Sequence, residues 1–166
     1  MSRVLWNFGG GPMIISCVYV VILAVSADGV LGDMPVERFP QSGQVQVAVH
    51  PAEVAGENYH VKGIRRTFRD HGMPITSKGT TLEEVKCILV PERWNEHDPN
   101  AVAVLVGAHH VGYLPADLAR HYSTGLLRLA ELGTLASGLA RIWAKADAGV
   151  IRARVTVLLP EATAFA

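Results

Sequence analysis

The polar loop at residues 92–100, with the sequence ERWNEHDPN, holds the side chains best suited to recognition chemistry. Asp98 is a good acceptor for a hydroxyl and a poor neighbour for a phosphate, so in a nucleic-acid pocket it suits the end of a strand. Trp94 would offer an indole face to a base, and such stacking contributes about 1–3 kcal/mol per base. Asn95 and Asp98 equally suit a turn, because their side chains bond to nearby backbone groups, and Trp94 could instead cover the core. The loop is therefore a candidate recognition site whose residues could also be structural.

A basic and aromatic face is predicted near the C-terminus. Arg141, Trp143 and Lys145 alternate along one strand, and Arg152 and Arg154 alternate along the next. Alternation places each set on one side of its own strand. Whether the two sets share a face depends on the register, which the sequence does not determine. If they share one, the face could bind a single nucleic-acid strand; otherwise it is a solvated sheet surface.

Signatures of catalysis and of metal binding are absent from the sequence. The histidines form no His-Glu-x-x-His pattern, and Cys17 and Cys87 lie too far apart to make a zinc-finger ladder. The sequence also lacks Gly-x-Ser-x-Gly and a Gly-rich phosphate loop with Lys. We therefore expect no cofactor, no metal and no enzymatic activity, so that any helicase or hydrolase activity would belong to a partner.

Composition places the chain among globular proteins. Of 166 residues, 49% are hydrophobic and 18% are charged, which excludes a disordered chain and provides for one domain. Equal numbers of basic and acidic residues give a formal net charge of +0, so any binding to nucleic acid must depend on local charge. Two cysteines do not make a disulfide framework, and a cytoplasmic protein is the default expectation.

The chain divides into three parts. Residues 1–43 form a hydrophobic segment followed by a Gly- and Pro-rich linker, residues 44–160 form the domain, and residues 161–166 are a tail. Residues 13–25 are apolar but too short to cross a bilayer comfortably, so a membrane is not the expected partner. With the small residues up to position 27, they could instead be a signal for export or a membrane anchor. They could also form a buried strand at 18–25, or follow from a misassigned start codon.

Periodicity predicts a β-rich domain with two helices. Alternation and short apolar runs predict strands at residues 44–49, 85–90, 101–106, 110–114, 139–144 and 151–159. Helical spacing predicts one helix over residues 59–69, where Gly63 costs about 1 kcal/mol relative to Ala. A second helix is predicted from Pro115 to Gly133, with a break at 123–125, and Pro51 is expected to interrupt the first strand. Because strands and helices do not alternate, the predicted fold is α+β, mainly β with two helices, in a small and partly open barrel.

Three motifs give the sequence a family resemblance. They are a Gly-containing strand with a following aromatic (Val54-Ala55-Gly56-Glu57-Asn58-Tyr59), the block PERWNEHDPNAVAV at residues 91–104, and Val111-Gly112-Tyr113-Leu114 before a helix. Through these motifs, the chain from about residue 53 to 159 resembles the HIRAN domain. That domain occurs at the front of some eukaryotic SNF2-type DNA-repair helicases and as a short stand-alone protein in bacteria.

The resemblance implies an OB-like β-barrel that binds the 3′ end of single-stranded DNA. On this pattern Asp98 would accept a hydrogen bond from the terminal hydroxyl, with Asn95 as a supporting contact. Tyr59 and His97 would be stacking platforms, and Tyr113 would lie near a phosphate. The implied role is that of a sensor at damaged or stalled DNA, in repair or replication stress, with a helicase or nuclease as a partner in trans.

Two departures from the family pattern leave other functions open. Asn58 stands where DNA-binding members have Arg, and Ala116 stands where they have a phosphate-contacting Lys. Each lost cation weakens binding to a phosphate backbone. A protein-interaction module without DNA contacts is therefore the alternative, and an exported or membrane-tethered protein of unknown role is the third.

Overall fold

The structure, a computed structural model, describes residues 23–24 and 49–162. The predicted export segment at residues 13–27 and the predicted strand at 44–49 therefore lie almost entirely outside the described residues. Of the alternative strand at 18–25, only β1 (Leu23–Ala24) is described, and it pairs antiparallel with residues of β6 (Thr134–Asp147). In the described part of the chain, no helix is long and apolar enough to cross a membrane.

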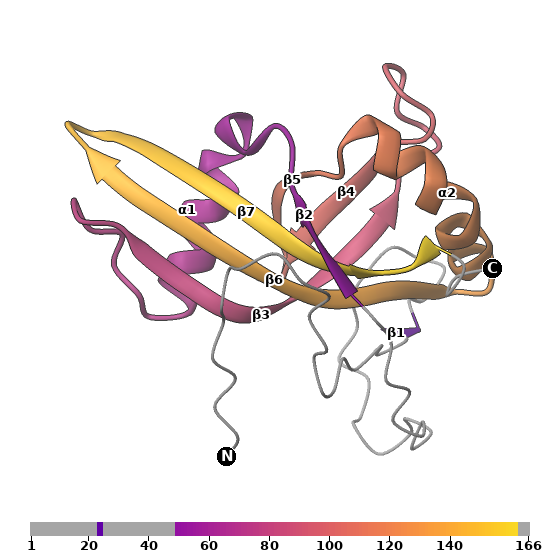
Figure 1. The fold of residues 1–166 in the computed structure, drawn as a ribbon, viewed down its shortest axis with the longest axis horizontal. Coiled ribbons are helices and arrows are strands. Elements are labelled where there is room, and N and C mark those ends of the chain that lie inside the picture. Colours follow the sequence, from indigo (N-terminus) through magenta and orange to yellow (C-terminus); the bar gives the residue numbers. More distant parts are fainter. Residues whose placement is uncertain (1–22, 25–48, 163–166) are drawn as a thin grey trace, which may run out of the picture.

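One antiparallel sheet forms the frame of the domain (Figure 1). Its main strands follow the order β2-β7-β6-β3-β4-β5. The strands other than β1 and β6 span Val49–Glu53 (β2), Thr80–Pro91 (β3), Val102–Val106 (β4), His109–Tyr113 (β5) and Val150–Pro160 (β7).

The two ends of this sheet meet at one point. The Ala55 N–H, just after β2, donates to the Tyr113 carbonyl of β5 at 2.7 Å, and the Tyr113 N–H donates to the Ala55 carbonyl at 2.9 Å. This bridge joins the first and last strands of the sheet order, so the sheet curls back on itself. The fold is the expected one: mainly β with two helices, in an OB-like and partly open barrel.

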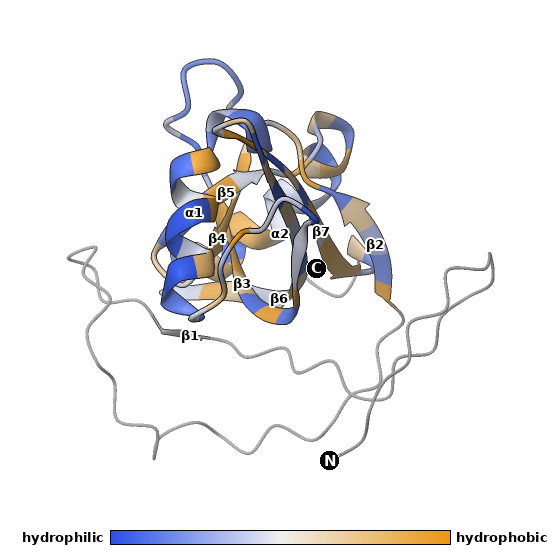
Figure 2. Ribbon diagram, turned by 90° about the vertical axis from the view of Figure 1, so that its left-hand side faces the viewer, coloured by the Kyte–Doolittle hydropathy of each residue, from blue (hydrophilic) through white to orange (hydrophobic). Residues whose placement is uncertain are grey.

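Two helices cover the sheet. A single 3₁₀ turn, η2 (Glu57–Tyr59), leads into α1 (Val61–Asp70), which packs against β5. The second helix, α2 (Ala116–Glu131), packs against β6 and β3 and ends before Gly133, as predicted. Figure 2 shows the hydrophilic side of α1 turned outward, away from the sheet.

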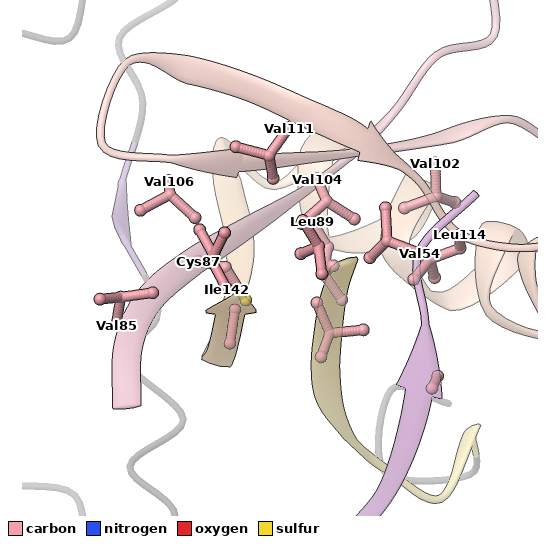
Figure 3. Close-up of a cluster of buried hydrophobic side chains, with 14 of the residues drawn as sticks. Val54, Val85, Cys87, Leu89, Val102, Val104, Val106, Val111, Leu114 and Ile142 are labelled. Carbon is pink, nitrogen blue, oxygen red and sulfur yellow. The ribbon is translucent and has the colours of Figure 1, made fainter. Parts of the chain in front are cut away.

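The barrel interior is filled mainly by aliphatic side chains. Those of β3, β4 and β5 meet there together with Val54 and Ile142 (Figure 3). In β7 the predicted alternation is confirmed, since Val155 and Val157 are fully buried while Arg152 and Arg154 are exposed. Burial of this kind contributes about 25 cal/mol per Å² of apolar surface, so the core accounts for most of the stabilisation.

Gly63 is required by the contact between α1 and β5. A Cβ built at this position would lie 2.0 Å from the carbonyl oxygen of His110. No side chain fits at that distance, so the helix approaches the strand through its glycine. From the sequence alone, this glycine is recognisable only as a residue that weakens the helix.

Two predicted interruptions are wrong. β2 runs through Pro51, which faces Leu158 of β7, and proline is tolerated because β2 lies at the edge of the sheet order. α2 runs unbroken through residues 123–125. The buried Ser123 hydroxyl donates to the Asn100 side chain at 3.3 Å and to the Arg120 carbonyl at 3.4 Å, so its polar group is satisfied without interrupting the helix.

Two strands are longer than predicted. β3 begins at Thr80 rather than at residue 85, because a bulge between Leu82 and Val85 breaks the period-two pattern there. Glu84 in that bulge has a φ of 52°, which a regular strand residue does not adopt. β6 begins at Thr134 rather than at residue 139.

Candidate nucleic-acid interface

The polar loop between β3 and β4 is held by its own side chains. The Asn95 Oδ1 accepts hydrogen bonds from the N–H groups of His97 at 3.0 Å and Asp98 at 3.3 Å. The Asp98 Oδ1 accepts from the Asn100 N–H at 2.9 Å. These are the turn-forming bonds that the sequence analysis gave as the structural alternative to a recognition role for Asn95 and Asp98. They fix the loop in shape, which also keeps the half-buried Asp98 carboxylate in place.

Glu92 joins this loop to β5. Its Oε2 accepts one hydrogen bond from the Asn95 amide at 3.1 Å and another from the Tyr113 hydroxyl, also at 3.1 Å. Burial and the neighbouring Glu92 carboxylate raise the pKa of Tyr113, so its hydroxyl stays protonated at neutral pH. The half-buried Tyr113 thus anchors the loop to the barrel.

Three rings pack together beside this anchor. The His60 and His110 ring centroids lie 3.9 Å apart, and the Tyr113 ring lies 4.6 Å from His110 and 5.6 Å from His60. Burial lowers the pKa of His60, the nearby His110 lowers it further, and Glu92 opposes both effects. His60 is therefore neutral at pH 7. The interior of the site is aromatic and lies next to one carboxylate.

Sequence reasoning missed His60, His110 and Glu92 as parts of this site. His60 directly follows the predicted site residue Tyr59, and Glu92 is the first residue of the polar loop that holds the other predicted residues. These positions in the sequence could have indicated that both belong to the site. His60 and Glu92 each contact Tyr113. The contact of His60 with Tyr113 depends on the Ala55–Tyr113 bridge, which no local sequence pattern indicates.

Two aromatic side chains at the site are left in solvent. Tyr59 on η2 is 91% exposed, and Trp94 in the polar loop is 73% exposed. The alternative that placed Trp94 over the core is therefore wrong. Figure 1 shows η2 and the polar loop at the same upper edge of the molecule. His97 is also exposed.

The basic and aromatic residues near the C-terminus lie on one face of the sheet. The β6–β7 register places Trp143 opposite Arg154, Lys145 opposite Arg152, and Arg141 opposite Thr156. Directly opposed residues point to the same side of a sheet, so the open question about register is answered. Arg141, Trp143, Arg154 and Thr156 line a shallow pocket of about 330 Å³.

Two of the arginines on this face have acidic partners. The Arg141 Nε lies 3.0 Å from Glu83 Oε1, and the Arg154 Nε lies 3.5 Å from Glu53 Oε1. Trp143 is 36% exposed, and its indole lies so close to Gly79 that a Cβ there would be 2.7 Å from Nε1. The face is therefore basic and aromatic, but part of its charge is compensated.

The structure thus divides the predicted residues into two sets. One lies on η2, the polar loop and β5 (Tyr59, Trp94, Asn95, His97, Asp98 and Tyr113). The other lies on β6 and β7 (Arg141, Arg152 and Arg154). Among the described residues, no group of three His, Cys, Asp or Glu side chains could hold a metal ion.

Comparison with known families separates the same two sets. Residues 57–132 match the model of the HIRAN domain family. This part of the chain is a HIRAN domain. The match runs from η2 to the end of α2, so it contains the six candidates of the first set and excludes the three arginines of the second. A HIRAN domain is a nucleic-acid-binding module, and this gives the chain its broad functional class.

Comparison with solved structures finds a crystal structure of a protein from Lactobacillus plantarum. The two chains share 19% identity and a TM-score of 0.36, over 68% of this chain and 94% of the other. A search of the curated proteins gave no significant match.

Proposed function

We propose that the HIRAN domain binds the 3′ end of single-stranded DNA. Asp98 accepts a hydrogen bond from the terminal hydroxyl, with Asn95 in support, and Tyr59 and Trp94 stack on the last bases. The observation that carries the proposal is the exposure of these two rings, 91% and 73%, beside a loop whose shape is already fixed. Exposed rings of this kind are the platforms on which single strands stack.

The carboxylates explain the preference for an end. Glu92 and Asp98 both lie in or beside the polar loop, and each would repel a phosphate placed in the middle of a strand. A terminal hydroxyl carries no charge and donates a hydrogen bond. In the described chain the Asp98 Oδ2 has no hydrogen-bond partner, whereas its Oδ1 holds the turn. The same side chain can therefore shape the loop and bind the hydroxyl.

The arginine-bearing face of β6 and β7 is a secondary contact in this proposal. Trp143 supplies a partly exposed ring, and Arg152 and Arg154 supply charge near it. Each phosphate contact on a single strand contributes a slope of about −0.7 to a plot of log affinity against log salt. With Asn58 and Ala116 in place of cations, we expect a slope of only about −1.4 to −2.1, corresponding to two or three contacts.

The protein would act without catalysis of its own, as a sensor of DNA ends in repair or replication stress. A helicase or nuclease acting in trans would supply any enzymatic step. The second candidate function is a protein-interaction module that does not bind DNA. The ion pairs Arg141–Glu83 and Arg154–Glu53 favour it, because they withdraw positive charge from the face that would hold phosphates.

Fluorescence titration with ten-nucleotide single strands tests the proposal. The strands end in a 3′-hydroxyl or a 3′-phosphate, and the full chain is compared with Asp98→Asn. Asparagine keeps an Oδ1 acceptor for the Asn100 N–H but removes the charge, so the turn is preserved. The native chain should bind the hydroxyl end more tightly, and Asp98→Asn should reduce that preference mainly by improving binding of the phosphate end.

A matched variant separates a local effect from a change in net charge. Asp147→Asn removes one carboxylate at the end of β6, far along the chain from the polar loop, and should leave the preference unchanged. If neither strand binds at low salt, the nucleic-acid proposal fails and the interaction module becomes the better hypothesis. Binding without any end preference would refute the role of Asp98.

A further inference from the structure

A second groove lies away from the polar loop, between α1 and the β6–β7 hairpin. It has a volume of about 610 Å³. Its lining comes from α1, from the segment after it and from the start of β7, including Arg65, Arg69, Met73, Ile75 and Ile151. Figure 1 shows the hairpin extending beyond α1 at the left of the molecule.

One side of this groove is an unpaired strand edge. β6 pairs with β7 from Val150 onward, whereas β2 pairs with β7 only between Thr156 and Pro160. The Val155 carbonyl still accepts from the Val54 N–H on that side, at 2.8 Å. Alternate residues of a strand direct their backbone groups to the same side. The backbone groups of Ile151 and Ala153 therefore face the same way, and no described strand pairs with them there.

The opposite side of the groove is positively charged. Arg65 and Arg69 of α1 line it, whereas the exposed Lys62 and Arg66 belong to the same helix but lie outside the groove. The one carboxylate in this helix, on Asp70, is already bonded to His109 at 2.6 Å and lies 3.6 Å from Arg69. Within the part of the chain that the structure describes, Arg65 forms no ion pair. A carboxylate placed in the groove would find an available guanidinium.

The floor of the groove suits aliphatic groups better than bases. Met73 is 39% exposed, and Ile75 and Ile151 are half-buried. The aromatic residue of the lining, Phe68, is only 1% exposed, so it offers no face for stacking. Nucleic-acid bases bind single-strand sites chiefly by stacking on aromatic rings. The lining therefore favours a polypeptide over a nucleic acid.

We propose that this groove binds an extended, acidic segment of a partner protein by strand addition to β7. The segment's backbone would pair with Ile151 and Ala153, its aliphatic side chains would contact Met73 and Ile75, and its carboxylates would pair with Arg65 and Arg69. An edge strand beside a helix is a common site for this mode of recognition, in which backbone bonds give affinity and pockets give specificity. The surface is separate from the polar loop, so the proposal does not depend on DNA binding.

A library of synthetic heptapeptides that alternate aliphatic and acidic residues provides the probe, with a matched library in which Lys replaces the acids. The full chain should select acidic members, and Arg65→Glu/Arg69→Glu should weaken the selected peptide at least about ten-fold, as expected for two lost charge-assisted bonds. Arg66→Glu is the control, because it reverses a charge on the same helix but outside this groove. It should change affinity by less than about three-fold.

Backbone pairing is tested directly on the peptide. Methylation of those alternate amide nitrogens that would donate to β7 should abolish binding, whereas methylation of the intervening ones should not. In NMR spectra, the amides of Ile151 and Ala153 should shift on binding.

Four results would each overturn the proposal. The first is that the chain does not select acidic peptides, and the second is that the double variant binds the selected peptide as tightly as the native chain does. The third is that the position of the methylated amides does not affect binding. The fourth is that the NMR shifts are confined to the polar loop. Displacement of the peptide by single-stranded DNA would assign the groove to nucleic acid, and self-association through β7 would assign it to a second copy of the chain.

Discussion

Replacing Gly63 by alanine should destabilise the protein, although the same change stabilises most helices. Alanine normally gains about 1 kcal/mol over glycine inside a helix. Here the new Cβ would lie 2.0 Å from the His110 carbonyl oxygen and 3.1 Å from the carbonyl carbon. The backbone of α1 fixes the position of the Cβ, and the atoms it meets belong to the backbone of β5, so no side-chain rotation can relieve the clash. The helix and the strand must separate instead.

The size of the effect follows from that separation. Cβ contacts below 3.0 Å are essentially never seen, so α1 must move by about an ångström. Overpacking of this kind costs about 1–3 kcal/mol, and a backbone clash belongs at the upper end. The shift also loosens the packing of Ile64 and Phe68, which are 0% and 1% exposed. After the helix gain is subtracted, we expect a net loss of about 2 kcal/mol in the free energy of unfolding.

Chemical denaturation of the full chain, followed by circular dichroism, measures this loss. For a domain of this size, about 2 kcal/mol corresponds to a melting temperature lower by roughly 8 °C. Lys62→Ala, at the exposed neighbouring position of the same helix, should stay within about 0.5 kcal/mol of the native chain. A Gly63→Ala protein as stable as the native one, or more stable, would refute the close approach of α1 to β5.

Three further predictions concern the binding face, the ring cluster and the buried thiol. Trp143→Ala should weaken oligonucleotide binding about ten-fold, within the range of one lost stacking contact, as measured by fluorescence titration. Because burial holds the pKa of His60 below its ordinary value of 6.5, the unfolded chain binds the extra proton first. The melting temperature should therefore fall as the pH is lowered below about 6.5, and His60→Gln should reduce this fall. Burial raises the pKa of the Cys87 thiol to about 12, so in a Cys17→Ser protein it should not react with a thiol reagent at about pH 8 until the protein unfolds.

Each of these predictions has a result that would contradict it, and the first also has a control variant. Leu132→Ala, at an exposed apolar position beyond α2, should leave oligonucleotide binding unchanged, and equal losses in the two variants would argue against stacking on Trp143. An unchanged pH dependence in His60→Gln would show that other groups account for the acid instability. Reaction of native Cys87 as fast as that of a free thiol would contradict its burial.

The elements that the sequence predicts well are those whose pattern is local. In β7 the alternation of buried valines and exposed arginines appears directly in the sequence, and α1 follows the apolar spacing of Ile64 and Phe68. The start of β3 was missed because the bulge at Glu84 inserts one residue into the alternation. The interruption predicted at Pro51 was wrong for a different reason. The effect of a proline on a strand depends on the position of that strand in the sheet, which is a non-local property.

The candidate site divides in the same way. Asn95 and Asp98 were predictable, because Asn and Asp in a short polar loop form side-chain bonds over two or three residues. The contact of His60 with Tyr113 was not, because it joins segments that are far apart in the sequence. The shared face of Trp143 and Arg154 required the register of β6 on β7, and period two alone leaves that register open.

The bridge between Ala55 and Tyr113 has a consequence for the order in which the domain opens. β3 and β6 share a long ladder of paired residues, whereas the two ends of the sheet meet through a single pair of backbone bonds. The least paired junction of a fold has the lowest free energy of local opening. Tyr59 follows Ala55 closely in the chain, so the segment that carries its exposed ring can separate from β5 while the rest of the barrel stays folded. Amide hydrogen exchange at Ala55 and Tyr113 would thus report the opening of the interface, and exchange within β3 would report the unfolding of the whole domain.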